Sequence, residues 1–221
     1  EFFTPEQSRA ILATRLASLT RGYSGVSWNL LDLLVELLNR NILPVIPQEG
    51  SVGASGDLTP LSYVAGTLIG ERDTYYKGEV VLAAKAFEQE GLSPIKLRPK
   101  EGLAIMNGTA VMTALACTAY KRAEYATKLM ARITSLSSLA LKGNSNHFDD
   151  ILFSFKPHPG QNQIAKWIQG DLNHHVHPRN SHRLQDRYSI RCAPHVIGVL
   201  ADSLPWLRSM IENELNSAND N

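Results

Sequence analysis

The sequence has few cysteines and almost no net charge. Cys117 and Cys192 are the only two cysteines in 221 residues, and their wide separation fits a reducing compartment better than a disulfide framework or a metal site. Lys and Arg together number 22 and Asp and Glu 21, so no strong field favours nucleic acid or an anionic membrane. We find neither a secretory leader nor an apolar run long enough to span a bilayer, and therefore expect a cytoplasmic protein.

Apolar residues at helical spacing predict an all-α fold. Hydrophobic residues make up 43% of the chain, and they recur every three or four positions in what we expect to be two core helices, residues 10–19 and 28–38. Lys77-Gly78 predicts the turn of the only hairpin, which we expect to be peripheral. An unbroken helical pattern from Gly108 to Leu141 indicates a bundle of long helices. Further helices are expected at residues 59–70, 83–90, 160–172 and 194–216.

The stretch from Gly50 to Leu61 reads Gly-Ser-Val-Gly-Ala-Ser-Gly-Asp-Leu-Thr-Pro-Leu. It does not fit a hydrolase elbow, because Gly56 follows Ser55 directly where that motif has one residue between them. It does not fit a phosphate loop, because Asp57 would repel a phosphate at the mouth of the next helix. It also lacks the Gly-x-Gly frame of a dinucleotide site.

A turn at Ala54-Ser55-Gly56 has another chemical use. If the turn is tight, the Gly56 amide nitrogen reaches the Ala54 carbonyl carbon, and a residue without Cβ tolerates the dihedral angles that this needs. Loss of one water at the ring and of a second from Ser55 would leave an exocyclic methylene conjugated to an imidazolone. Such a group is an electrophile that no ordinary side chain offers.

This stretch resembles the motif of the histidine, phenylalanine and tyrosine ammonia-lyases and the related aminomutases, which carry the self-made cofactor 4-methylidene-imidazol-5-one (MIO). The resemblance covers the whole chain and implies an all-α, long-helix bundle of the ammonia-lyase type. It makes residues 1–221 the central part of a single ammonia-lyase domain, with the N-terminal and C-terminal parts of the family's fold outside them. Other segments resemble the family in the family's order: residues 22–26, 101–109, 157–161, 185–192 and 214–221.

The resemblance implies roles for the residues at and near the loop. Ala54, Ser55 and Gly56 would form the cofactor, and Asp57 would assist its formation. The alternative for Asp57 is a plain helix cap. Asn107 would take part in catalysis and substrate binding by hydrogen bonding near the cofactor, and its alternative is a C-cap or turn residue beside Gly108.

Three further site residues are implied in the segment 185–192. Gln185, Tyr188 and Arg191 stand three residues apart, so on a helical turn they would face one pocket. Arg191 would clamp the substrate carboxylate with its planar guanidinium, with Gln185 also in the substrate site and Tyr188 in the catalytic set. The alternatives are an ion pair for Arg191 and an ordinary buried aromatic for Tyr188. The histidines of the polar loop 173–183 lack carboxylate or Cys partners, so we expect no metal.

The resemblance implies a lyase that eliminates ammonia from histidine, tyrosine or phenylalanine to give urocanate, coumarate or cinnamate. Tyr188-Ser-Ile-Arg-Cys192 resembles the histidine and tyrosine branches more than the plant-type phenylalanine branch. One alternative is an MIO-dependent 2,3-aminomutase, which returns the amine to the β-carbon. Another is a catalytically silent helical scaffold that retains the loop.

The family's assembly also bears on activity. In the family, the catalytic Tyr lies well upstream of the loop and a site Glu lies downstream, and each active site draws on three subunits of a homotetramer. The resemblance therefore implies self-association in the whole protein. Residues 1–221 by themselves are expected to be inactive or nearly so, and whether the ring forms in them stays open.

Overall fold

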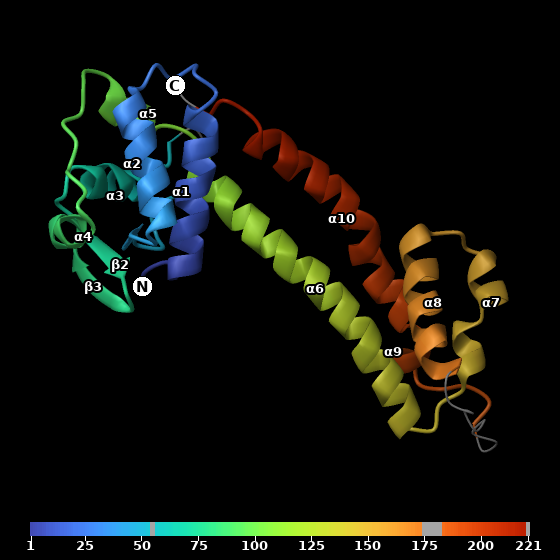
Figure 1. The fold of residues 1–221 in the computed structure, drawn as a ribbon. Helices are drawn as coiled ribbons and strands as arrows, with labels where there is room; N and C mark the ends of the chain where they lie inside the picture. Colours follow the sequence, from blue (N-terminus) through green and yellow to red (C-terminus); the bar gives the residue numbers. More distant parts are fainter. Residues whose placement is uncertain (54–55, 174–182, 220–221) are drawn as a thin grey trace. The chain divides into compact units, whose positions relative to one another are not determined.

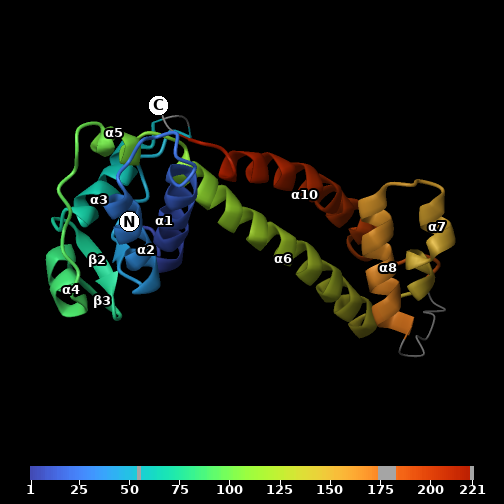
Figure 2. The ribbon, with the colours of Figure 1, turned by 45° about the horizontal axis from the view of Figure 1, so that its top comes forward.

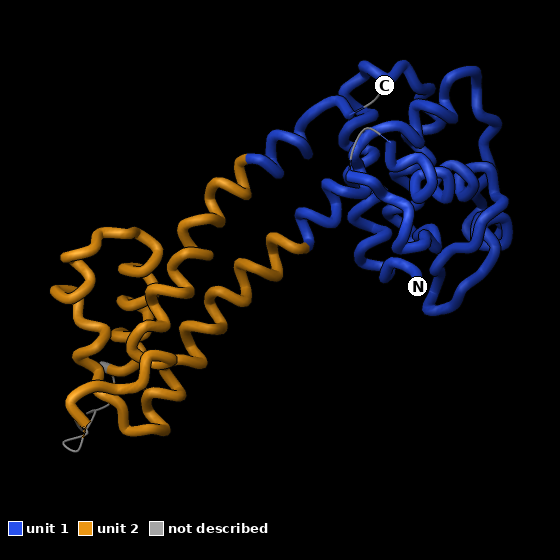
Figure 3. Tube along the Cα trace, turned by 180° about the vertical axis from the view of Figure 1, so that it is seen from behind, with its two compact units in different colours: residues 1–118, 210–221 blue, residues 119–209 orange. Residues whose placement is uncertain are grey.

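A computed structural model describes residues 1–53, 56–173 and 183–219. The chain divides into two compact units, coloured in Figure 3. Unit 1 comprises residues 1–118 and 210–221, and unit 2 comprises residues 119–209. The place of the chain within one domain of a longer protein stays a prediction.

In the described residues, unit 1 contains five helices and a small sheet (Figure 1). It also contains the first turns of one long helix and the last turns of another, both of which continue into unit 2. Its own elements, in chain order, are α1 (Pro5–Leu19), α2 (Trp28–Asn39), β1 (Leu43–Pro44), α3 (Leu58–Leu68), β2 (Asp73–Tyr76), β3 (Glu79–Leu82), α4 (Ala83–Glu90) and α5 (Glu101–Met106). The boundary between the units falls inside two long helices, α6 (Ala110–Ala140) and α10 (Ala193–Leu215). Unit 2 adds the 3-10 helix η1 (Ser145–Phe148), α7 (Asp150–Ser154), α8 (Pro159–Asn173) and α9 (Tyr188–Arg191).

The predicted all-α architecture is confirmed. The long helix expected after Gly108 is α6, with 31 residues, and the helices expected at 28–38, 83–90 and 194–216 are found within a residue or two. α1 begins earlier than the apolar pattern indicated, because Thr4 and Gln7 form a capping box. The Thr4 hydroxyl accepts the Gln7 N–H at 3.3 Å and the Gln7 side chain accepts the Thr4 N–H at 3.0 Å.

The β structure is larger than expected. The hairpin of β2 and β3 turns at Lys77-Gly78 as predicted, but β1 adds a third antiparallel strand through Leu43 and Pro44. The predicted hairpin is therefore confirmed, and the third strand was not predicted. Two residues that include a proline show no alternating pattern, so β1 pairs because tertiary contacts bring it to the edge of β2.

The core of unit 1 lies among α1, α2, α3 and the sheet. The apolar positions that predicted the first two helices are its centre, because Ile11, Leu12, Leu30, Leu34 and Leu37 have no exposed surface. Burying each such side chain contributes roughly 1.5–3 kcal/mol. In both views α1 and α2 lie side by side, as their contacts require (Figures 1 and 2).

Unit 2 has its own smaller core. Apolar side chains of α6, η1, α8 and the first turns of α10 form it, with Ile164 and Ile168 of α8 fully buried. α7 lies beside α8 in both views (Figures 1 and 2). The carboxylate of Asp202 on α10 accepts the backbone N–H of Gly160 at 2.6 Å, which ties the start of α8 to α10.

Among the residues that the structure describes, one helical stretch is apolar enough to cross a membrane by length and composition. Glu101–Ala140 contains an 18-residue window of mean hydropathy 1.4, so the expectation of no such run was wrong. This apolar stretch is hard to recognise in the sequence because Gly, Asn and Thr interrupt its apolar residues. Half of that window, 50%, is buried inside the protein, and the core helix of a soluble protein passes the same test.

A buried carboxylate joins the start of α2 to the start of α5. Glu101 is 4% exposed and accepts the backbone N–H of Ser27 at 2.7 Å and of Arg98 at 2.6 Å. Ser27 is the N-cap of α2, as predicted, but its side chain makes no capping bond. Burial by itself would raise the pKa of the Glu101 carboxyl, yet these two N–H groups outweigh it and the pKa is lowered.

The Glu101 carboxylate is expected to make stability depend on acid. Its folded pKa lies below the unfolded value of about 4.3, so its contribution is present above that pH and is lost as the pH falls through the folded pKa. Glu101→Gln keeps one acceptor oxygen and should lower the free energy of unfolding at neutral pH by about 1–2 kcal/mol. Thermal unfolding between about pH 3 and pH 7 should show a weaker acid dependence than the parent. The exposed Glu88→Gln should match the parent, and an unchanged acid dependence in Glu101→Gln would contradict the assignment.

Candidate active site

Asp57 is fully buried, and both of its carboxylate oxygens accept hydrogen bonds. Its side chain has no exposed surface, and Oδ2 accepts the backbone N–H of Val111 at 3.0 Å and of Met112 at 3.1 Å. These N–H groups lie in the first turn of α6, so the carboxylate also meets the positive end of that helix. Asp57 is the N-cap of α3, but its side chain makes no capping bond there. The alternative of a helix cap therefore holds for the backbone at α3, but the carboxylate caps α6 instead.

The loop before Asp57 is anchored at both ends. Ser51 Oγ donates to Oδ1 of Asp57, and the Gly53 N–H donates to Ser51 Oγ at 3.3 Å. Gly53 has φ +64°, in the left-handed region that favours glycine. At the other end the Asp57 N–H donates to the Gly108 carbonyl at 3.2 Å. Both ends of the loop are thus attached to the same turn and helix start.

The three predicted ring-forming residues lie between these anchors. Ala54 and Ser55 are outside the described residues, and Gly56 is described. A Cβ built on Gly56 would meet no atom of the described residues within 4 Å. Gly53 and Asp57 are hydrogen-bonded on either side, and no other described residue lies close to the side-chain position of Gly56.

Asn107 lies next to the loop through its neighbour Gly108. It is the C-cap of α5, so the C-cap alternative describes its backbone correctly. The C-cap alternative does not account for its side chain. The residue is 8% exposed, and Oδ1 has no hydrogen-bond partner among the described residues. Leaving such an oxygen unpaired costs about 1–3 kcal/mol, so a donor placed beside it would be stabilised.

Tyr188 and Arg191 form one cluster at α9. The guanidinium carbon of Arg191 lies 4.2 Å from the centroid of the Tyr188 ring, a cation–π distance. Arg191 Nε donates to the Asp186 carbonyl at 3.0 Å. Tyr188 is 72% exposed in this chain, so the buried-aromatic alternative does not hold here. Within the described ranges Arg191 makes no ion pair, and its ion-pair alternative is not found there.

Gln185 does not share the helical turn of the other two. α9 begins at Tyr188, so the prediction that all three face one way on a helix was wrong for Gln185. The reason lies in Asp186, which is buried. Its carboxylate accepts the Asn144 N–H at 2.6 Å and its own N–H donates to His147 Nε2 at 3.1 Å. These tertiary bonds hold the backbone before α9 out of the helix.

Sequence reasoning missed two hydrogen bonds that organise the loop region. Ser51 holds Asp57, and the Thr109 hydroxyl donates to the Glu214 carboxylate on α10. Ser51 and Asp57 both stand in the quoted motif, and Thr109 and Glu214 stand in two family-like segments. Membership of these segments was the available signal. Ser51 and Asp57 are six residues apart, but no helical or strand spacing pairs them, and Thr109 and Glu214 are 105 residues apart.

The family comparison decides the identity of the fold. The family described as aromatic amino acid lyase matches residues 1–221. The chain belongs to that family. Human histidine ammonia-lyase is 40% identical over 226 residues, which cover 99% of this chain and 34% of the human protein. The chain therefore spans about a third of that relative.

Two solved structures resemble the chain along its whole length. Phenylalanine aminomutase from Pantoea agglomerans has a TM-score of 0.92 and 34% identity, covering 100% of this chain and 46% of that one. Histidine ammonia-lyase from Trypanosoma cruzi has a TM-score of 0.88 and 32% identity, covering 100% of this chain and 41% of that one.

The predicted site residues of this lyase-family chain fall into two groups. Gly56, Asp57 and Asn107 belong to unit 1, where the Asp57–Gly108 bond brings them together. The residues of the 185–192 segment belong to unit 2. There Tyr188 lines an apolar cavity of about 360 Å³ between α6 and the start of α10.

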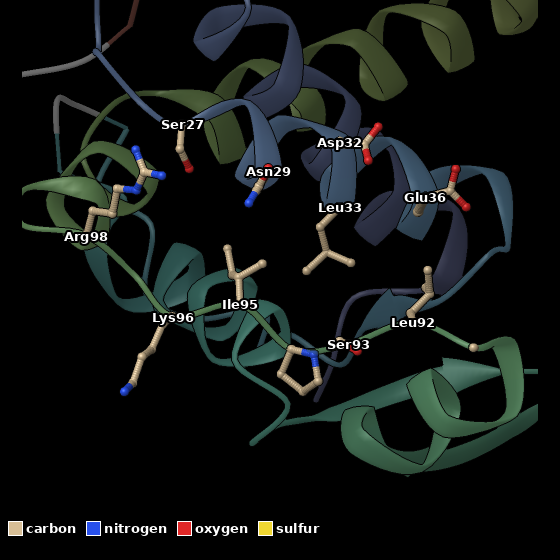
Figure 4. Close-up of a pocket in the computed structure, with 12 residues that line it drawn as sticks. Ser27, Asn29, Asp32, Leu33, Glu36, Leu92, Ser93, Ile95, Lys96 and Arg98 are labelled. Carbon is tan, nitrogen blue, oxygen red and sulfur yellow. The ribbon is translucent and has the colours of Figure 1, made fainter.

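A second cavity in the lyase-family chain lies away from these residues. It measures about 530 Å³ and lies between α2 and the extended segment before α5. Figure 4 shows Leu33 and Ile95 projecting into it while Lys96 points away. Of the predicted site residues that the structure describes, none lines it. His174, His175 and His177, which we expected to lie in a solvated loop, lie outside the described residues.

Proposed function

We propose that the whole protein eliminates ammonia from an aromatic L-amino acid, with an MIO electrophile formed from Ala54, Ser55 and Gly56. The observation that carries the proposal is the anchored loop around Asp57. Asp57, the residue that follows Gly56, has a buried carboxylate that binds the start of α6 and Ser51. Asn107 precedes Gly108, which bonds Asp57, and the buried Oδ1 of Asn107 has no partner among the described residues. This oxygen is the acceptor that the family resemblance puts near the cofactor.

Each predicted residue has a definite task under this proposal. The methylidene carbon of the cofactor supplies an electrophile for the substrate. Asn107 accepts a hydrogen bond through Oδ1, which orients the group beside it. Arg191 binds the substrate carboxylate through its terminal nitrogens, since its Nε is already used by the Asp186 carbonyl. Tyr188 packs on the Arg191 guanidinium and keeps it in place.

Histidine is the substrate that we propose first, with urocanate as product. Support comes from the curated relatives named histidine ammonia-lyase, of which the human one is 40% identical. Tyrosine and phenylalanine, which would give coumarate and cinnamate, remain the other members of the proposed class. Gln185 is proposed to contact the substrate from the bend before α9.

A 2,3-aminomutase is the second candidate, and one observation favours it. The aminomutase from Pantoea agglomerans resembles this chain with a TM-score of 0.92. An aminomutase uses the same electrophile, so the loop geometry supports both activities equally. The two differ in product, because an aminomutase accumulates a β-amino acid rather than the acrylate alone.

We also propose that the whole protein works as a homotetramer in the cytoplasm. Support for self-association comes from α6, where large apolar side chains repeat on one face of the part in unit 2. Tyr125 is 66% exposed and Leu136 65%, with Leu129 and Ile133 exposed between them. An apolar stripe of this kind on a long helix is typical of a face covered by another helix.

The test of the proposed function combines a mass and a product. The peptide carrying residues 54–56 of the whole protein should weigh two waters less than its unmodified sequence. The protein should then convert histidine to urocanate, followed by absorbance, with tyrosine and phenylalanine assayed in parallel. The unmodified mass in the whole protein would overturn the proposal, and accumulation of a β-amino acid would replace the lyase by the aminomutase.

A further inference from the structure

A fully buried arginine lies behind the turn that carries Asn107. Arg15 on α1 has no exposed surface, although its neighbours along that face, Ile11, Leu12 and Leu19, are apolar core residues. A buried guanidinium is costly unless its N–H groups are bonded. Arg15 donates to the carbonyl of Ala104 on α5 and, at 2.5 Å, to the carbonyl of Asn219. The terminal nitrogens of the guanidinium thus bond two main-chain oxygens.

Gly108 lies directly against these groups. A Cβ added to Gly108 would lie 2.3 Å from the Asn219 carbonyl oxygen and 2.5 Å from Arg15 Nη1, and its φ of +135° also favours glycine. The guanidinium and the Asn219 carbonyl therefore form the surface on which the Asn107-Gly108 turn rests. The side chain of Asn219 adds a bond to the Glu214 carbonyl at 2.9 Å.

The Asn107-Gly108 turn is bonded to the end of the loop that precedes Asp57. The Gly108 carbonyl accepts the Asp57 N–H at 3.2 Å, one residue after Gly56. A path of direct contacts therefore runs from Arg15 through Gly108 to Asp57, the anchor of the loop. We propose that Arg15 is a positioning residue for ring closure at residues 54–56. This inference rests on the proposed function, because it assigns Arg15 a part in forming the same electrophile.

The physical argument concerns alignment. Ring closure requires the Gly56 nitrogen to stay within reach of the Ala54 carbonyl carbon, and a misplacement on the order of 1 Å costs about a hundredfold in rate. Removing the guanidinium takes a donor from the buried Ala104 carbonyl and from the partly buried Asn219 carbonyl, and it leaves a void behind Gly108. The turn can then relax away from the loop, so closure slows even in molecules that fold.

The experiment compares three variants of the whole protein. Arg15→Met keeps most of the volume without the N–H groups, Arg15→Lys keeps the charge without the planar fork, and Arg9→Met is the matched control. Arg9 is on the same helix, but its guanidinium donates to the Leu38 carbonyl at 2.6 Å, on α2. For each variant the folded fraction is isolated, and the share of its loop peptide that lacks two waters is measured.

In the folded fraction we expect this share to fall about tenfold in Arg15→Met and about threefold in Arg15→Lys, and to be unchanged in Arg9→Met. A purely structural role would lower the melting temperature and leave the share unchanged in folded molecules. That result in Arg15→Met overturns the inference. If Arg15→Met yields no folded protein, Arg15→Lys decides, and an unchanged share in it overturns the inference equally. Absence of the mass deficit in the parent protein is a different failure, because it removes the proposed function itself.

Discussion

Ser55→Ala is expected to abolish turnover in the whole protein, with a fall in kcat of about a thousandfold or more, equivalent to about 4 kcal/mol of lost transition-state stabilisation. The reason is chemical, because alanine has no hydroxyl to leave as the second water and so cannot supply the exocyclic methylene. Turnover would be followed as acrylate absorbance, and the peptide carrying residues 54–56 would be weighed in the same preparation.

The control for this variant is a second serine-to-alanine change close by. Ser62 on α3 donates to the Thr59 carbonyl at 2.6 Å within its own helix, so Ser62→Ala should retain both the mass deficit and the turnover. Turnover that survives in Ser55→Ala would contradict the lyase and the aminomutase together. An unmodified loop peptide together with no turnover in the parent protein would favour the alternative of a catalytically silent helical scaffold.

Asp57→Ala is expected to lower both stability and ring formation. The change removes a fully buried acceptor from two N–H groups at the start of α6 and from the Ser51 hydroxyl. We expect a loss of about 3 kcal/mol in the free energy of unfolding and a fall of roughly 6–12 °C in melting temperature. The share of loop peptide that lacks two waters should fall about tenfold, since the residue after Gly56 loses its anchor.

One variant separates the hydrogen bonds of Asp57 from its negative charge, and a second is a control for removing a carboxylate. Asp57→Asn retains one acceptor oxygen and is expected to lose about half as much stability. Asp32→Ala removes an exposed carboxylate of the same unit and should stay within about 0.5 kcal/mol of the parent. An Asp57→Ala protein with the parent's melting temperature would show that the carboxylate does not hold α6 and the loop together.

Local pattern predicted most of the helices because the apolar spacing of this chain is unambiguous. Leu30, Leu34 and Leu37 repeat at helical intervals and are all buried. Elements without such a pattern were missed, among them α5, α7 and the two-residue strand β1. Those are short, and short elements form because their neighbours pack on them rather than through their own propensity.

The site shows the same division. The motif pointed to Asp57 and to Asn107, but it could not show that the Asp57 carboxylate caps α6 rather than its own helix. It also placed Gln185 on a helical turn that Asp186 prevents. In both cases the deciding partner lies more than 40 residues away in sequence, and no periodicity reports such a contact.

The sequence by itself determined the helical class, the family to which the chain belongs and the loop at which its chemistry is proposed. Each of these depends on residues that are close in sequence, either as apolar residues at helical spacing or as a run of adjacent residues. Only the tertiary structure decided that Arg15 is buried beneath Gly108 and that Asp57 binds the start of α6. The physical reason is that a buried polar group takes whatever partner folding brings to it, because leaving it unpaired costs more than any local preference.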